Sequence, residues 1–136
     1  MKTRSVLTLD DVKLLLQAAE QEALKNNWQV AIAVLDDGAH LLGFVRMDAA
    51  TPANAKIAIE KAGTAALSRR SSKSWEDRVA AGRMSMLKMP VLPVQGGLPI
   101  VIDGYCIGAI GVSGVQSHED EQIAEAAIRA VLSGLN

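Results

Sequence analysis

The amino-acid sequence predicts an α+β domain in which helices flank a central antiparallel sheet. Two apolar segments contain a turn signal, Asp36-Asp37-Gly38 in one and Asp103-Gly104 in the other, and so predict two β-hairpins. A helix-start signal follows each hairpin. Because hairpin-linked strands pair antiparallel and helices must bury their apolar sides on the sheet, this order favours a layered α+β fold.

Composition restricts both the core and the range of partners. The 136 residues are 49% hydrophobic but only 3% aromatic, which predicts one domain over residues 1–136 with a core of small aliphatic side chains. A net charge of −1 argues against a nucleic-acid partner. The single cysteine suits a reducing compartment, and the longest apolar run, VAIAVL, is too short to cross a membrane. We therefore expect a cytoplasmic protein with no membrane partner.

In the first half, each predicted element has a local signal. Thr8 is the expected N-cap of a helix that ends at Asn26-Asn27. The strands on either side of Asp36–Gly38 are largely apolar on both faces, which places this hairpin in the middle of a covered sheet. Thr51 followed by Pro52 then predicts a second helix, reaching about Arg70.

The second half is less regular until its last hairpin. A short helix is expected around 75–81, followed by a loop rich in Pro and Gly. The segment LPIVIDGYCIGAIGVSG predicts the second hairpin. The last helix is expected to begin at Ser117, with Asp120 completing a capping box, and to run to about Leu132.

Three glycines, Gly108, Gly111 and Gly114, interrupt the last apolar strand. A phosphate loop would need a lysine or a G-x-G-x-x-G at the exit of a strand, and neither is present. Alternation along a strand places Gly111 on the same face as Ile107. A glycine within a strand indicates close approach of a neighbour. Packing of the Ala-rich helix over 55–67 is the favoured explanation, and a flat ligand or a second subunit is the alternative.

Four segments together resemble a known family. They are KNNWQVAIAVLDDGAHLLGFVRMD, EKAGTAALSRR, the pair Gly82-Arg83, and GGLPIVIDGYCIGAIGVSG. The chain resembles the GlcG/HbpS family of small haem-binding bacterial proteins, which is related to the C-terminal domain of PduO corrinoid adenosyltransferases. The resemblance implies a profilin-like α+β fold, haem as a candidate cofactor, and a homo-oligomer, often an octamer.

His40 is the candidate metal ligand, because imidazole is a common axial ligand of haem iron. Leu41, Leu42 and Phe44 follow it and could form an apolar wall. The alternative is a partly exposed histidine that makes ordinary hydrogen bonds.

The other candidate ligand-binding residues are Arg46, Asp48, Lys61, Arg83 and Gly111. Arg46 at a strand end could hold a carboxylate or a haem propionate, with Asp48 orienting it. A structural ion pair that ties the strand end to the next helix is the alternative. Lys61 belongs to a basic stretch that could bind an anion or a neighbouring subunit, and the alternative is a solvated helix face. No nucleophile with a nearby base can be identified, so the catalytic residues are unknown.

These observations support three functional hypotheses. The first is a small-ligand-binding accessory protein that takes haem or a related tetrapyrrole. The second is an enzyme or binding protein for a small 2-hydroxy or 2-oxo acid, since GlcG-like members are associated with glycolate metabolism. The third is a structural subunit of a homo-oligomer, because the apolar content exceeds what three helices readily cover.

Overall fold

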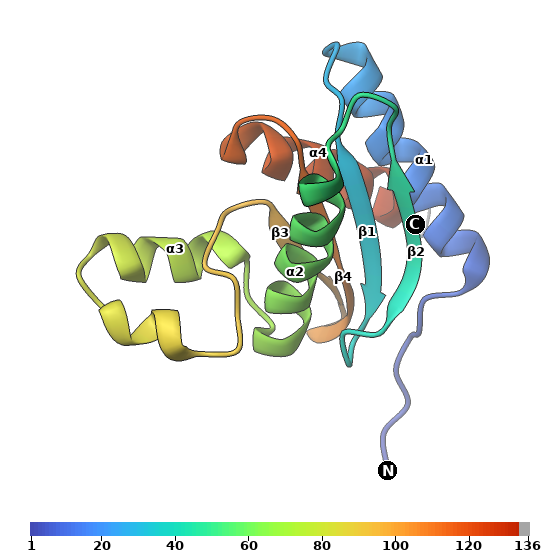
Figure 1. Ribbon diagram of the computed structural model, residues 1–136. Helices are drawn as coiled ribbons and strands as arrows, with labels where there is room; N and C mark the ends of the chain where they lie inside the picture. Colours follow the sequence, from blue (N-terminus) through green and yellow to red (C-terminus); the bar gives the residue numbers. More distant parts are fainter. Residues whose placement is uncertain (134–136) are drawn as a thin grey trace.

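A computed structural model describes residues 1–133 as an α+β domain built on one four-stranded antiparallel sheet (Figure 1). In chain order the elements are α1 (Leu9–Lys25), β1 (Ala31–Asp36), β2 (Leu41–Arg46), α2 (Pro52–Ser68), α3 (Ser72–Ala80), the 3-10 helix η1 (Met84–Lys88), β3 (Gly97–Ile102), β4 (Tyr105–Ser113) and α4 (Ser117–Leu132). The strand order is β2-β1-β4-β3. The predicted fold class and both hairpins are confirmed.

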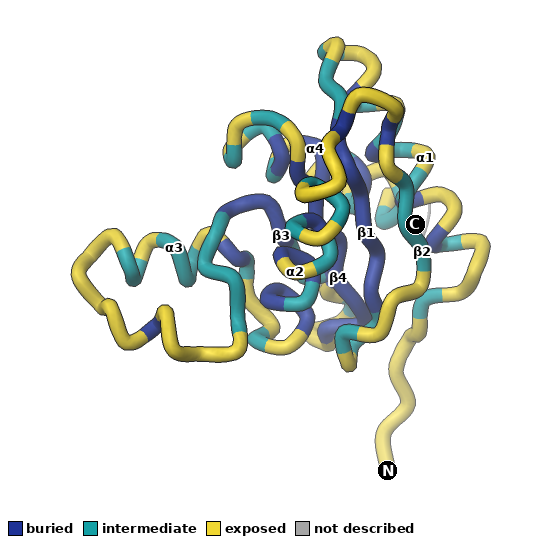
Figure 2. The backbone as a smooth tube through the Cα atoms, viewed as in Figure 1, coloured by how far each residue is buried: buried dark blue, intermediate teal, exposed yellow. Residues whose placement is uncertain are grey.

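Helices cover both faces of the sheet. Helices α1 and α4 pack on one face around Leu15, Ile32, Ile110 and Ile123, which are fully buried. Helix α2 lies across the other face (Figure 1), against alanines of β1 and β4. Helix α3 and η1 form an arm that projects from the body and is mostly exposed (Figure 2). In the described part of the chain, no helix is long and apolar enough to span a membrane.

Capping boxes explain where the first two long helices begin. The Thr8 hydroxyl accepts a hydrogen bond from the Asp11 N–H at 3.2 Å, and the Asp11 carboxylate accepts one from the Thr8 N–H at 2.8 Å. Thr51 and Asn54 make the same reciprocal pair at the start of α2. Helix α2 ends at Ser68 because Arg69 adopts a left-handed conformation with φ of 59°.

Three expectations about the elements were wrong. Strand β2 lies at an edge of the sheet, since β1 pairs with β2 on one side and with β4 on the other. The capping box of α4 uses Gln116 and Glu119, one residue earlier than expected, because the Asp120 carboxylate points into the protein. A register shift in the β3–β4 ladder leaves Ile107 unpaired, so it packs on the α1/α4 face rather than beside Ala109.

The irregular segment contains more helix than expected. Helix α3 begins at Ser72, about one turn before the predicted start, with the Ser71 hydroxyl as its cap. The 3-10 helix η1 was not predicted and has no side-chain cap. Its sequence, MSMLK, carries no start signal that a local pattern could detect.

Candidate functional site

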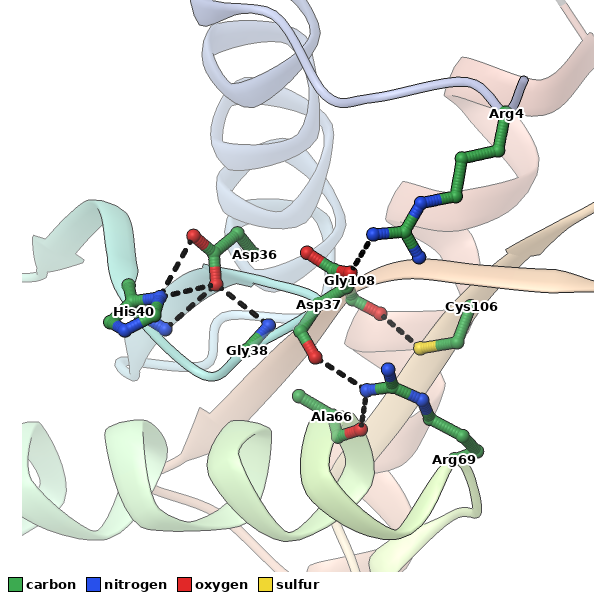
Figure 3. A network of polar contacts seen from close by, with 9 residues as sticks. All are labelled: Arg4, Asp36, Asp37, Gly38, His40, Ala66, Arg69, Cys106 and Gly108. Carbon is green, nitrogen blue, oxygen red and sulfur yellow. Dashed lines mark hydrogen bonds and ion pairs between the residues drawn. The ribbon is translucent and has the colours of Figure 1, made fainter. Parts of the chain in front are cut away.

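The β1–β2 turn holds His40 in a defined orientation. The Asp36 carboxylate accepts hydrogen bonds from the backbone N–H groups of Gly38 and His40, both at 2.9 Å. It also lies 3.1 Å from His40 Nδ1 (Figure 3). The hydrogen bond from the His40 backbone is the main reason that the pKa of Asp36 is lowered, and burial opposes it only in part. The charged carboxylate is thus the favoured partner of the ring.

This contact determines which nitrogen of His40 faces outward. A carboxylate accepts hydrogen bonds, so the network assigns the proton to Nδ1 and leaves the lone pair on Nε2. The His40 side chain is 81% exposed. A carboxylate that fixes the tautomer and orientation of a histidine is the usual outer-shell partner at metal sites. The turn therefore presents a histidine whose Nε2 can bind a metal from solution.

Other contacts attach the same turn to distant parts of the chain. Asp37 forms an ion pair with Arg4 of the N-terminal segment, and its carbonyl accepts a hydrogen bond from Arg69 after α2 (Figure 3). Arg69 also donates to the Ala66 carbonyl at 2.6 Å. The turn is held by two distant segments, through Arg4 and Arg69, which limits the positions that His40 can take.

An apolar strip of β2 adjoins His40. Leu41 and Leu42 are 53% and 38% exposed, and Phe44 is partly buried. Leu41 and Phe44 pair with Leu35 and Ala33 of β1, whose side chains pack on the α2 face of the sheet. Helix α2 lies mainly over β1 and β4, so this strip forms the open flank of the sheet. Leu41, Leu42 and Phe44 thus leave apolar surface exposed on the strand that follows His40.

Arg46 and Asp48 lie at the far end of β2 from His40, and both are exposed. Neither residue takes part in any of the ion pairs formed by the described residues. The structural ion pair considered for these two residues is therefore absent from residues 1–133. Arg46 lies six positions after His40 along an extended strand, a distance of roughly 20 Å. One chain alone does not bring these candidates together.

Lys61 is a structural residue in the interior of the protein. Its side chain is 3% exposed, and Nζ donates to Asp120 Oδ2 at 3.0 Å and to the Val112 carbonyl at 3.1 Å. The expectation that Lys61 contributes to an accessible basic stretch was wrong. Burial raises the pKa of Asp120, although the Lys61 charge opposes the shift. The pair joins α2 to α4 across the end of β4.

The two remaining candidates also lie away from His40. At Gly111, an added Cβ would come 2.2 Å from the Ala58 carbonyl oxygen and 2.5 Å from the Ala62 nitrogen. The close neighbour at this glycine is therefore helix α2, as the favoured explanation predicted. Arg83 is exposed and lies on the projecting arm between α3 and η1.

Sequence reasoning missed Asp36 and Asp120. Asp36 could have been found, because an aspartate that starts a turn commonly accepts hydrogen bonds from N–H groups two to four residues later. Asp120 could not, since its partner Lys61 is 59 residues away in the sequence. The position of Asp120 near the start of the last helix indicated instead that it caps the helix N-terminus.

The fold and this site define a class of protein, a small α+β domain that displays one oriented histidine beside an apolar sheet edge. The family model described as haem degrading protein HbpS-like matches residues 7–129. The chain belongs to this family.

Individual relatives agree with this assignment. The chain is 48% identical over 114 residues to the protein GlcG of Escherichia coli K12, covering 83% of this chain and 85% of that one. The crystal structure of Klebsiella pneumoniae ORFY superposes with a TM-score of 0.89 at 26% identity, over 98% of this chain and 97% of that chain. The structure of a PduOC–haem complex matches with a TM-score of 0.85 at 28% identity, over 93% and 95%. The resemblance seen in the sequence is confirmed.

Proposed function

We propose that this protein binds haem or a related tetrapyrrole at the start of β2, with His40 Nε2 as the axial ligand of the iron. The observation that carries the proposal is the His40–Asp36 contact at 3.1 Å, which directs Nε2 of an 81% exposed side chain outward. Haem iron is held in many proteins by one proximal histidine. The family description and the haem complex of a structural relative support this ligand class.

The surroundings of His40 suit a flat apolar ring. Leu41 and Phe44 lie along one face of the strand next to His40 and can contact such a ring, which would remove their exposed surface from water. Bound haem would supply an iron centre, and the protein would orient it through His40 and Asp36. Asp36 is a positioning residue in this proposal because it acts through the imidazole.

Titration with haemin, followed by the Soret absorbance, tests the proposal. His40→Ala should abolish the saturable Soret shift that the unmodified protein gives. The chain contains one other histidine, His118, which is exposed in the first turn of α4 and provides a matched control. His118→Ala should titrate like the unmodified protein. An unchanged Soret shift in His40→Ala, or no shift in the unmodified protein, would contradict the proposal.

A second candidate function is binding of a small 2-hydroxy or 2-oxo acid, with or without catalysis. It is favoured by the exposed position of Arg46, which has no ion pair with Asp48 in residues 1–133. A guanidinium can bind a carboxylate through two parallel hydrogen bonds. Thermal unfolding with glycolate or glyoxylate should then show a higher midpoint for the unmodified protein but not for Arg46→Ala. Equal increases of the unfolding midpoint in both proteins would exclude Arg46 as the residue that binds the carboxylate.

A further inference from the structure

A small cavity lies between the N-terminal segment, helices α1 and α4, and the β3–β4 hairpin. Its volume is about 170 Å³. Apart from Ser5 and Asp11, every residue that lines it is Val, Leu or Ile. Leu15 of α1, Ile100 of β3 and Ile107 of β4 are buried and form its inner wall. The cavity is therefore an apolar space that extends into the core on the α1/α4 face of the sheet.

Residues 4–7 form a strap over this cavity. At Gly108 of β4, an added Cβ would come 2.6 Å from Leu7 Cδ1, so the missing side chain leaves room for Leu7 to lie on the sheet. The other attachment is the ion pair of Arg4 with Asp37 of the β1–β2 turn (Figure 3). An ion pair in contact with water contributes little to stability. The strap can therefore move aside at small cost, which gives a molecule a route into the cavity.

The size and lining of the cavity determine which class of molecule fits. An engineered apolar cavity of about 150 Å³ in another protein binds benzene, so a space of this size suits a group of roughly six carbon atoms. The described residues that line it include no Lys, Arg or His, and Asp11 is their only charged member. A carboxylate would be repelled by Asp11 and would lose its hydration without gaining a partner. An uncharged molecule has neither penalty.

We propose that this cavity binds an uncharged apolar molecule of roughly six carbon atoms, and that the strap covers the bound molecule. Side chains around such a cavity lack packing partners on one side, and a bound hydrocarbon supplies those contacts. Transfer of the hydrocarbon from water adds a favourable term that grows with the apolar area buried. The lining residues do not include His40 or any part of β2, so this site is separate from the proposed haem site.

Benzene titration, followed by backbone amide chemical shifts in NMR, tests the site. The unmodified protein should show saturable shift changes at the lining residues. Val131→Phe and Ile128→Phe each place a larger side chain of α4 in the cavity and should abolish these changes. Val101→Phe is the matched control, because Val101 of β3 is exposed and does not line the cavity. Circular dichroism identifies any variant that fails to fold. No saturable binding by the unmodified protein, or full binding by a folded cavity-filling variant, would overturn the site.

Competition between 1-hexanol and hexanoate tests the chemical class of the ligand. The two molecules share the same hydrocarbon chain length and differ in the charge of the head group. At neutral pH, 1-hexanol should displace benzene from the unmodified protein, whereas hexanoate should leave the benzene-induced shifts unchanged. Equal displacement by both molecules would overturn the preference for an uncharged ligand.

Two further variants test the strap and the separation from His40. Arg4→Ala removes the ion pair with Asp37 and should increase the rate at which benzene leaves, measured by NMR exchange. Lys2→Ala is the control, since Lys2 forms no ion pair within residues 1–133. Equal exit rates in both variants would refute the strap as a cover. His40→Ala should bind benzene like the unmodified protein, and loss of binding there would contradict a separate site.

Discussion

Lys61 Nζ lies 3.0 Å from Asp120 Oδ2, and the two side chains are 3% and 2% exposed. Both charges are thus removed from water, and each is the counter-charge of the other. Asp120 Oδ1 also accepts a hydrogen bond from the Val115 N–H at 3.1 Å, which fixes the loop before α4. The residue that the sequence presented as a surface cation is part of the framework that holds α2, β4 and α4 together.

Removing one member of this pair should destabilise the protein strongly. Lys61→Met and Asp120→Leu should each lower the free energy of unfolding by about 3–5 kcal/mol, because an uncompensated charge remains buried. The double variant should be more stable than either single variant. Urea denaturation measures all three. In the exposed pair Lys73–Asp77, Lys73→Met should have little effect. A similar loss of stability in Lys61→Met and Lys73→Met would mean that burial does not determine how much an ion pair contributes.

The Lys61→Met variant should also acquire a pH dependence. Burial already raises the pKa of Asp120, and loss of Lys61 removes the charge that opposes this shift. A folded-state pKa above the unfolded value means that the folded protein binds more protons, so stability decreases as pH rises. We expect Lys61→Met to lose less stability at pH 5 than at pH 8, relative to the unmodified protein, in urea denaturation. An equal loss at both pH values would contradict this account.

Two glycine-to-alanine changes, one in β4 against α2 and one within α2 facing β1, should have opposite effects on stability. At Gly111, the new Cβ would lie 2.2 Å from a backbone oxygen of α2, so the helix must shift. Gly111→Ala should therefore lower the free energy of unfolding by about 1–3 kcal/mol. At Gly63, within α2, the nearest atom would be Leu35 Cδ1 at 3.9 Å, an ordinary contact. Gly63→Ala should therefore stabilise the helix by up to about 1 kcal/mol. Thermal unfolding of both variants provides the comparison, and a tolerated Gly111→Ala would refute tight helix packing there.

Asp36→Asn should weaken haemin binding without abolishing it. An amide cannot provide the charged acceptor that orients His40 through Nδ1, and loss of an outer-shell partner typically costs 10–100-fold in metal affinity. The bound form should keep the Soret position of the unmodified protein, since the ligand itself is unchanged. Haemin titration measures both quantities. Unaltered affinity would show that Asp36 stabilises the turn but does not support the ligand.

Local signals accounted for most of the elements. Thr8, Thr51 and the two Asp-Gly turns each act through neighbours a few residues away, and α1, α2 and both hairpins formed where these signals placed them. Gly111 was correctly predicted to accommodate a closely packed helix. The resemblance to the family was also carried by the sequence alone. These features depend on short-range geometry or on residue identity.

Tertiary structure decided which of these elements are covered. Nothing local distinguishes β2, at an open edge, from β1 in the centre, because strand order depends on the pairing of β1 with β4, far along the chain. The burial of Lys61 likewise depends on Asp120, 59 residues away. His40 and Arg46 were both candidate ligand-binding residues, but an extended strand holds them roughly 20 Å apart within one subunit. The sequence by itself determined the family, the fold class and the elements that begin with a local signal, but not η1. Long-range packing alone determined which charges are interior and which edge is open.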